Sequence, residues 1–239
     1  MGGRNDRRTD RGPPPNRSES TDDSSRSGLV LYVFDIASSI LIVAAIGGFL
    51  FAASGVWPPL VAIESGSMEP HIQEGDLVFV MEEHRFPGGG AQGDSGVVTA
   101  REGRETGYRM FEGYGDVIVY QPYGSTEQTP IIHRAMFWVE EGENWYDEAD
   151  PEYVSNADSC EELANCPAPH SGFITKGDST SVSQDYDQAM RITSPVRPEW
   201  VIGTAEVRVP ILGEIRLLTG QTGARSQART NSTAAAVGP

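Results

Sequence analysis

The sequence has almost no lysine. Of its 18 basic residues 17 are arginine, and the one lysine is Lys176, against 34 acidic residues and a formal net charge of −16. Residues 1–35 hold six arginines and six acids, so the whole acidic excess follows the apolar stretch described below. Such a surface binds nucleic acid poorly, because neutralising phosphates requires clustered lysine and arginine. Dispersed acidity with little lysine favours a protein that stays soluble in concentrated salt, so we expect a halophilic source.

Cysteine is nearly as scarce as lysine. Cys160 and Cys166 are the only two, and they lie close together in a polar loop. If the domain is extracytoplasmic, a disulfide between them is one interpretation and two free thiols are the other. A zinc site with His170 would lack a fourth ligand, so we expect neither a metal ion nor another cofactor.

The chain has only one long apolar run. Residues 36–56 carry no charge and are long enough to cross a bilayer as a helix, so we predict a transmembrane helix over residues 29–56. Residues 1–28 precede it as a polar leader that is predicted to be disordered and is too long for a cleavable signal peptide. Six arginines lie before the run and the next basic residue is Arg85, so the N-terminus is predicted to be cytoplasmic and the domain extracytoplasmic.

The remainder has the pattern of a β domain over residues 57–218. Short runs rich in valine, isoleucine and aromatic residues predict strands at residues 77–81, 116–122, 131–140, 172–177 and 200–210. Two polar insertions, residues 86–115 and 141–170, separate some of these runs. Residues 219–239 form a low-complexity tail that is predicted to be disordered. The expected fold class is therefore mostly β, with one N-terminal transmembrane helix.

Serine chemistry is the candidate activity. A serine protease needs a hydroxyl, a base within hydrogen-bond reach, a group that orients the base, and donors for the oxyanion. Residues 64–70 read ESGSMEP, His133 lies inside a predicted strand, and residues 177–179 read GDS. Alone, each of these is more often a turn or a structural histidine.

Together and in this order, these segments resemble the conserved boxes of type I signal peptidases. SGSMEP (65–70) is similar to the nucleophile box that follows the membrane anchor of that family. The other similar segments are EGDLVFV (74–80), GDVIVYQP (115–122), IIHRAMFWV (131–139), FITKGDST (173–180) and VRPEWVIGTAEVRVPILGEIRLL (196–218). The resemblance implies a signal-peptidase-like antiparallel β catalytic domain.

The base box separates two types within that family. Bacterial members have a lysine there, whereas this chain has His133 followed by Arg134, as in the archaeal and endoplasmic-reticulum type. With the acidic composition, the resemblance implies a halophilic archaeal source. The only lysine, Lys176, lies in another box. An imidazole titrates near neutrality and needs no large pKa shift to act as a base, unlike a lysine.

The resemblance also implies the roles of individual residues. Ser67 would be the nucleophile and His133 the general base, with the Ser67 backbone N–H and the Ser65 hydroxyl as oxyanion donors. Gly66 would permit a close backbone approach. Met68 is assigned with Ser65 and Gly66 to oxyanion and substrate binding.

The aspartate behind the base is ambiguous. Asp178 matches the family's glycine-aspartate box directly. A second aspartate is expected about six residues later, but Gln184 occupies that position. We predict that Asp187 fills the role, through a short insertion at residues 180–183, and Asp185 is the alternative.

The implied function is a membrane-bound serine endopeptidase that removes signal peptides from secretory preproteins after small residues. Its expected partners are those signal peptides, membrane lipid and the general secretion translocon, and not nucleic acid. Two alternatives stay open at this point: a non-enzymatic, membrane-anchored β domain that binds partners, and a related self-cleaving serine protease.

Overall fold

The computed structural model describes residues 22–210 of the chain, and the side chains from residue 30 onward. Most of the predicted leader, the segment 211–218 of the predicted domain and the predicted tail therefore lie outside the described residues. The chain divides into two compact units between Gly48 and Phe49. The first unit contains most of the N-terminal helix, and the second contains the end of that helix and the β domain.

The N-terminal helix α1 spans Asp22–Ser54. It begins earlier than the predicted start at residue 29, because no proline lies between Pro15 and Pro58 to interrupt it. It ends before residue 56 because Gly55 adopts a left-handed φ of 80° and its N–H closes the last turn on the Phe51 carbonyl at 2.8 Å. Val30–Ser54 has a mean hydropathy of 2.3, so α1 is compatible with a single-pass membrane anchor.

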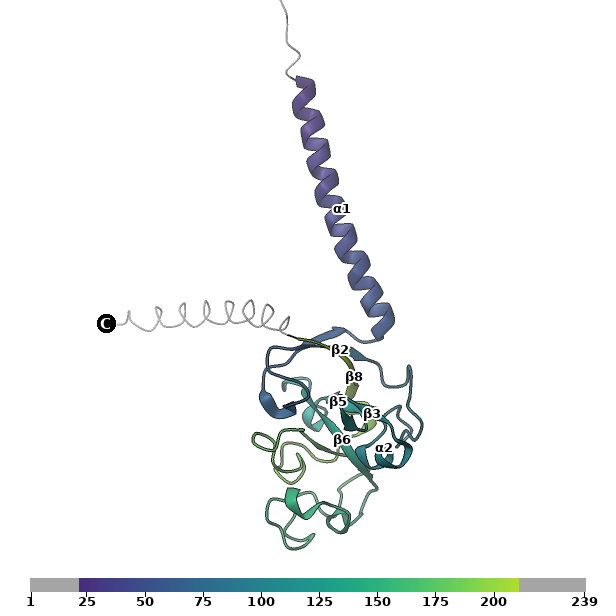
Figure 1. Ribbon diagram of the computed structural model, residues 1–239, viewed down its shortest axis with the longest axis vertical. Helices are drawn as coiled ribbons and strands as arrows, with labels where there is room; N and C mark the ends of the chain where they lie inside the picture. Colours follow the sequence, from purple (N-terminus) through teal and green to yellow (C-terminus); the bar gives the residue numbers. More distant parts are fainter. Residues whose placement is uncertain (1–21, 211–239) are drawn as a thin grey trace, which may run out of the picture. The chain divides into compact units, whose positions relative to one another are not determined.

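The domain is built on one six-stranded antiparallel sheet, in the order β1-β2-β8-β5-β6-β7. Figure 1 labels β2, β8, β5 and β6 of this sheet. The strands are β1 (Leu60–Ala62), β2 (Leu77–Met81), β5 (Val117–Tyr120), β6 (Ile131–Val139), β7 (Gly172–Lys176) and β8 (Val201–Val209). The predicted fold class is confirmed, and each predicted strand coincides with an observed one.

Smaller elements complete the domain. They are the helix α2 (Ala100–Thr106), the hairpin strands β3 (Arg109–Met110) and β4 (Gly113–Tyr114), and 3₁₀ turns at Gly66–Met68, Pro122–Gly124, Trp145–Asp147, Pro151–Tyr153 and Pro198–Trp200. The turn Gly66–Met68 connects β1 to β2 and carries the predicted nucleophile.

The central strand β5 is buried on both faces, as its unbroken apolar run indicates. Val117 and Val119 pack on one face with Met68, beneath the turn that connects β1 to β2. Ile118 and Tyr120 pack on the opposite face with residues of β6 and β7. Side chains alternate between the two faces of a strand, so His133, which is paired with Ile118, lies on the same face as Tyr120.

The two insertions contribute core residues despite their polar composition. Val97 of the first insertion is fully buried against the sheet. The second insertion packs on β6 and β7 through a shared apolar cluster, in which Trp145 of the insertion is fully buried. A disulfide joins Cys160 to Cys166, and His170 is engaged instead by the Ser171 carbonyl and the Ser194 hydroxyl. Of the two interpretations of the cysteines, the structure therefore has the disulfide.

Candidate active site

The turn that carries Ser67 is held by the packing of Met68 in the core and by a backbone hydrogen bond from Ser179. Met68 is fully buried in the core beneath it, so Met68 contributes packing, and its assigned part in substrate binding stays a prediction. The Ser67 carbonyl accepts a hydrogen bond from the Ser179 N–H at 2.9 Å. The Ser65 and Ser67 hydroxyl oxygens are 3.3 Å apart, with Ser65 exposed and Ser67 half-buried. Both hydroxyls therefore reach solvent from a turn whose backbone is held.

Within the described residues, a close backbone approach next to Ser67 occurs at Gly177, whereas the approach expected at Gly66 stays a prediction. A Cβ added to Gly177 would lie 2.4 Å from the Ser67 carbonyl oxygen, whereas one added to Gly66 would meet only the Glu69 carboxylate, at 3.1 Å. The Glu69 side chain is flexible and can move, but the Ser67 backbone cannot. Gly177 is therefore required for the position of Ser67, a role that sequence reasoning did not assign to it.

His133 lies on β6, almost completely buried, with its Nδ1 atom 2.8 Å from the Oδ2 atom of Asp187. Because a carboxylate accepts the Nδ1 proton, the neutral imidazole presents Nε2 as its acceptor. A base arranged in this way can take a proton at Nε2, while the carboxylate stabilises the imidazolium that forms.

Asp187 and Asp185 have different environments. Asp187 is fully buried, and its backbone N–H donates to the Thr175 carbonyl at 2.9 Å, which attaches it to β7. Asp185 is half-buried and accepts a hydrogen bond from the Ser155 hydroxyl at 2.8 Å, within the second insertion. The structure thus brings Asp187, and not Asp185, to His133.

Asp178 lies in a different pair. Its carboxylate accepts two hydrogen bonds from Arg134, from Nε at 2.8 Å and from Nη2 at 2.5 Å. It also lies 2.8 Å from Nδ1 of His71, which follows the Ser67 turn. Asp178 therefore links the end of β7 to β6 and to the segment after Ser67. Sequence reasoning did not assign His71 to the site, although His71 directly follows the ESGSMEP segment.

Ser67 and His133 share no hydrogen bond within residues 30–210; the described partner of the Ser67 hydroxyl is Ser65. The turn Gly66–Met68 nevertheless contacts β6. Hydrogen bonds between nucleophile and base are often long before substrate binds and tighten in the complex. The arrangement provides a half-buried hydroxyl near a strand that carries a buried, carboxylate-paired imidazole.

Asp116, which directly precedes β5, is a buried carboxylate outside this site. Its Oδ2 accepts from the Val98 N–H and its Oδ1 from the Tyr108 hydroxyl, both at 2.8 Å. Burial raises the pKa of Asp116 from 3.8 to about 6, and nearby Glu206 adds to the rise, while the two hydrogen bonds and Arg134 oppose it. Asp116 holds the first insertion against the sheet.

This raised pKa predicts a dependence of stability on pH. Between about pH 4 and pH 6 the folded protein binds more protons at Asp116 than the unfolded chain, so the free energy of unfolding should fall as the pH rises through this window. The expected contribution is at most about 3 kcal/mol. Denaturant unfolding followed by tryptophan fluorescence should show a smaller fall in Asp116→Asn. An equal fall in both proteins would contradict the assignment to Asp116.

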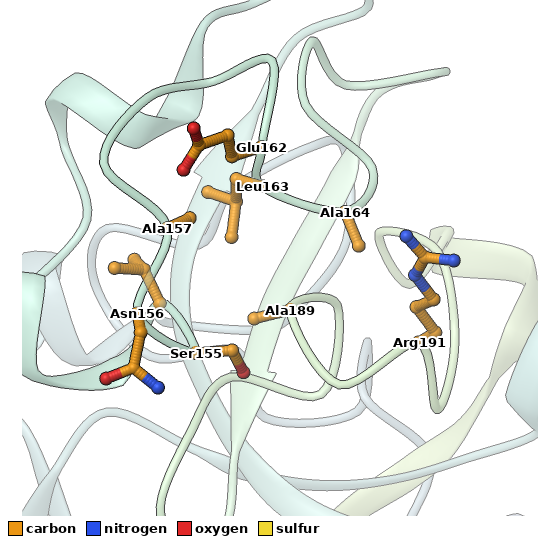
Figure 2. Close-up of a pocket in the computed structure, with 9 residues that line it drawn as sticks. Ser155, Asn156, Ala157, Glu162, Leu163, Ala164, Ala189 and Arg191 are labelled. Atoms are coloured by element: carbon orange, nitrogen blue, oxygen red, sulfur yellow. The ribbon is translucent and has the colours of Figure 1, made fainter.

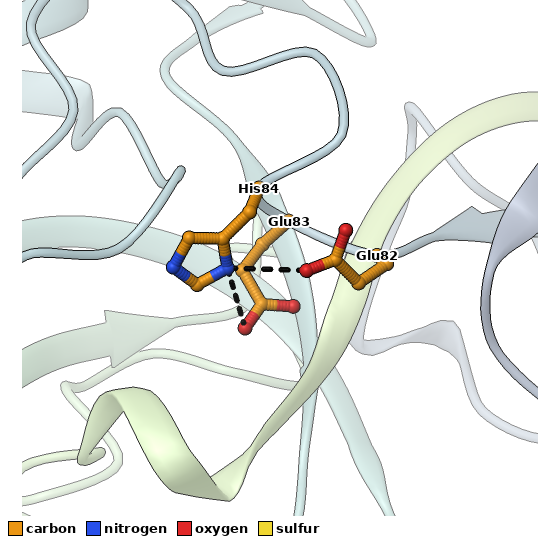
Figure 3. A group of neighbouring side chains, drawn as sticks. All are labelled: Glu82, Glu83 and His84. Carbon is orange, nitrogen blue, oxygen red and sulfur yellow. Dashed lines mark ion pairs between the residues drawn. The ribbon is translucent and has the colours of Figure 1, made fainter.

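Outside this site, a pocket and a side-chain cluster are candidates for holding a small ligand or an ion. A pocket of about 180 Å³ lies beside the disulfide loop and is lined by residues 154–157, 162–164, 189 and 191 (Figure 2). Glu82, Glu83 and His84 place ligand atoms within 4.8 Å of one another (Figure 3). The His84 ring pairs with both carboxylates, at 3.2 and 3.6 Å, which accounts for that cluster as surface ion pairs. Neither feature includes Ser67, His133 or Asp187.

Comparison with known proteins gives two distant relatives. Over 174 residues the chain is 25% identical to the signal peptidase complex catalytic subunit sec11 of Aspergillus oryzae. The aligned residues make up 72% of this chain and 70% of the relative. Over 170 residues it is 24% identical to the same subunit of Aspergillus terreus, covering 70% and 69%. No family model matches the chain. The similarity agrees with the resemblance to type I signal peptidases, whereas a halophilic archaeal source stays a prediction.

Proposed function

We propose that this chain is a membrane-bound serine endopeptidase that removes N-terminal signal peptides from exported preproteins. The observation that carries the proposal is the buried pair of Asp187 and His133, in which His133 lies on β6, the strand that the Ser67 turn contacts. The distant similarity to sec11 subunits supports the same reaction. Ser67, His133 and Asp187 are the proposed nucleophile, base and orienting carboxylate.

In the proposed reaction, the Ser67 hydroxyl attacks the scissile carbonyl and His133 takes the hydroxyl proton at Nε2. The Ser67 backbone N–H and the Ser65 hydroxyl stabilise the oxyanion of the tetrahedral intermediate. His133 then returns the proton to the leaving amine, which gives an acyl-enzyme on Ser67. A water molecule, deprotonated by His133, hydrolyses this ester and releases the signal peptide.

The proposed location is the extracytoplasmic face of the membrane, with α1 as the anchor and the N-terminus in the cytoplasm. Arginines before α1 and their absence immediately after it support this orientation. The Cys160–Cys166 disulfide is also typical of a domain outside the reducing cytoplasm. In this position the domain would meet signal peptides as they leave the general secretion translocon.

The proposed substrate is an extended segment with small side chains one and three residues before the cleaved bond. Such a segment can add to a sheet edge through backbone hydrogen bonds, while shallow pockets exclude larger side chains. Specificity would then depend on size at two positions rather than on charge.

The proposal predicts cleavage of a secretory preprotein by the full-length protein in lipid vesicles. Mass spectrometry of the products should find a single new N-terminus, after the small residue that ends the signal peptide. The matched control is the same preprotein with leucine in place of the two small residues, which should be cleaved at least about 10-fold more slowly. Intact preprotein would favour a non-enzymatic binding domain, and cleavage confined to the chain itself would favour a self-cleaving protease.

A further inference from the structure

The carboxylate behind His133 is held in an asymmetric way. Its Oδ2 atom accepts three hydrogen bonds, from His133 Nδ1 at 2.8 Å, the Tyr120 hydroxyl at 2.8 Å and the Thr175 hydroxyl at 2.6 Å. Its Oδ1 atom is buried and has no hydrogen-bond partner among residues 30–210. One oxygen therefore carries all the polar contacts of a fully buried charged group.

The three donors come from three adjacent strands. Tyr120 lies on β5, His133 on β6 and Thr175 on β7, and all three point to one atom of Asp187. Tyr120 and Thr175 are both fully buried. The convergence therefore depends on the sheet and not on a mobile surface loop.

The Thr175 hydroxyl has two acceptors within reach, and the Asp187 Oδ2 atom at 2.6 Å is much closer than the Tyr120 oxygen at 3.4 Å. The buried side-chain amide of Gln188 donates to the Thr175 oxygen at 3.2 Å and accepts from the Thr175 backbone N–H at 2.9 Å. A hydroxyl that accepts from an amide has its own proton available for the carboxylate. Burial, and then the Asp187 charge, raise the pKa of Tyr120 well above its ordinary value, so the Tyr120 hydroxyl keeps the proton that it donates to Asp187.

We propose that Tyr120 and Thr175 are positioning residues that hold the Asp187 carboxylate with its Oδ2 atom directed at His133. A fully buried carboxylate with one unpaired oxygen is costly unless charge-stabilising donors compensate for the lost water. Two neutral hydroxyls supply this compensation without adding a charge that would compete with the imidazolium. The expected effect of these two hydroxyls on catalysis rests on the proposed function, whereas their hydrogen bonds to Asp187 do not.

The proposal separates two roles of a buried hydroxyl. If a hydroxyl forms its hydrogen bond only to avoid being buried without a partner, its removal would affect folding but not catalysis by the folded protein. A hydroxyl that holds Asp187 would affect catalysis only while Asp187 carries its charge. The variants Tyr120→Phe and Thr175→Val remove one hydroxyl each and nearly preserve shape.

In the preprotein assay we expect each variant to lower kcat by on the order of 10-fold with KM little changed, since each removes a hydrogen bond to a charged group. Thr175→Ser, which keeps the hydroxyl, should recover most of the activity. The matched control is Tyr108→Phe, which removes a tyrosine hydroxyl from Asp116 outside the site and should keep wild-type kcat. In an Asp187→Asn background, Tyr120→Phe and Thr175→Val should have almost no further effect.

A second readout does not depend on activity. In Ser67→Ala protein, the proton NMR signal of the His133 Nδ1–H, identified by its loss in His133→Ala, should move when Tyr120 becomes Phe and should not move in Tyr108→Phe. Unchanged kcat in both Tyr120→Phe and Thr175→Val, with an unmoved Nδ1–H signal, would overturn the inference. If wild-type protein cleaves no preprotein, the proposed function fails, and the NMR comparison alone decides whether the hydroxyls hold Asp187.

Discussion

Ser67→Ala protein is expected to lose at least about 1,000-fold in kcat for preprotein cleavage, because the acyl-enzyme can no longer form. KM should change little, since the Ser67 turn is held by the Ser179 N–H and by buried Met68, and neither contact uses the Ser67 hydroxyl. The measurement is single-turnover cleavage by membranes that contain equal amounts of wild-type or variant protein.

Ser65→Ala is the matched control for this loss. It removes the neighbouring hydroxyl from the same turn, 3.3 Å away, and should lower kcat less, by about 100- to 1,000-fold if Ser65 is an oxyanion donor. If Ser65→Ala were inactive and Ser67→Ala kept residual activity, the roles of the two serines would be reversed. Undiminished processing by Ser67→Ala would reject Ser67 as the nucleophile.

His133 should act as one unit with Ser67. Residues that carry a single proton-transfer step show strongly non-additive losses, so His133→Ala should be about as inactive as Ser67→Ala, and the double variant should lose little more. Additive losses would indicate that His133 acts independently of Ser67, and another base would then have to be considered. His71 would be the first alternative, because it follows the same turn and pairs with Asp178.

Five of the six strands of the sheet could be predicted, because each is a short run of β-branched and aromatic residues bounded by turn residues. Residues 77–81 were predicted with the bounds that β2 has, and the other predicted strands differ only at their ends. The three-residue strand β1 was not predicted. The helix α2 was missed because seven residues are too few to show periodicity. Its end signals are nevertheless present in the sequence, with Thr99 accepting from the Glu102 N–H at the start and left-handed Gly107 at the end.

Contacts across the sheet could not be predicted from the sequence in the same way. Tyr120 resembles any other buried aromatic residue of a strand, and nothing local indicates that its hydroxyl reaches Asp187, 67 residues later. The choice between Asp185 and Asp187 depends on the path of the chain after β7, where the Asp187 N–H bonds the Thr175 carbonyl. A spacing of one or two residues in a loop does not encode that path.

Asp187→Asn is expected to lower kcat by on the order of 10,000-fold, which would be the second large effect. The substitution is well matched to its site. An asparagine oxygen in the Oδ2 position can accept from the same three donors, while its NH₂ group takes the Oδ1 position, which has no hydrogen-bond partner among the described residues. The geometry can therefore persist while the charge that stabilises the His133 imidazolium is lost.

Asp185→Asn is the control for this charge removal. The Asp185 carboxylate accepts only from Ser155 among the described residues, and an asparagine oxygen can accept that bond, so kcat should stay within about twofold of wild type. Thermal unfolding of both variants would separate a loss of catalysis from a loss of folded protein. If Asp185→Asn were inactive and Asp187→Asn active, the carboxylate that faces His133 in this structure would not be the one that catalysis uses. If both were inactive yet folded, the second insertion would have to contribute to substrate binding through Asp185 and Ser155.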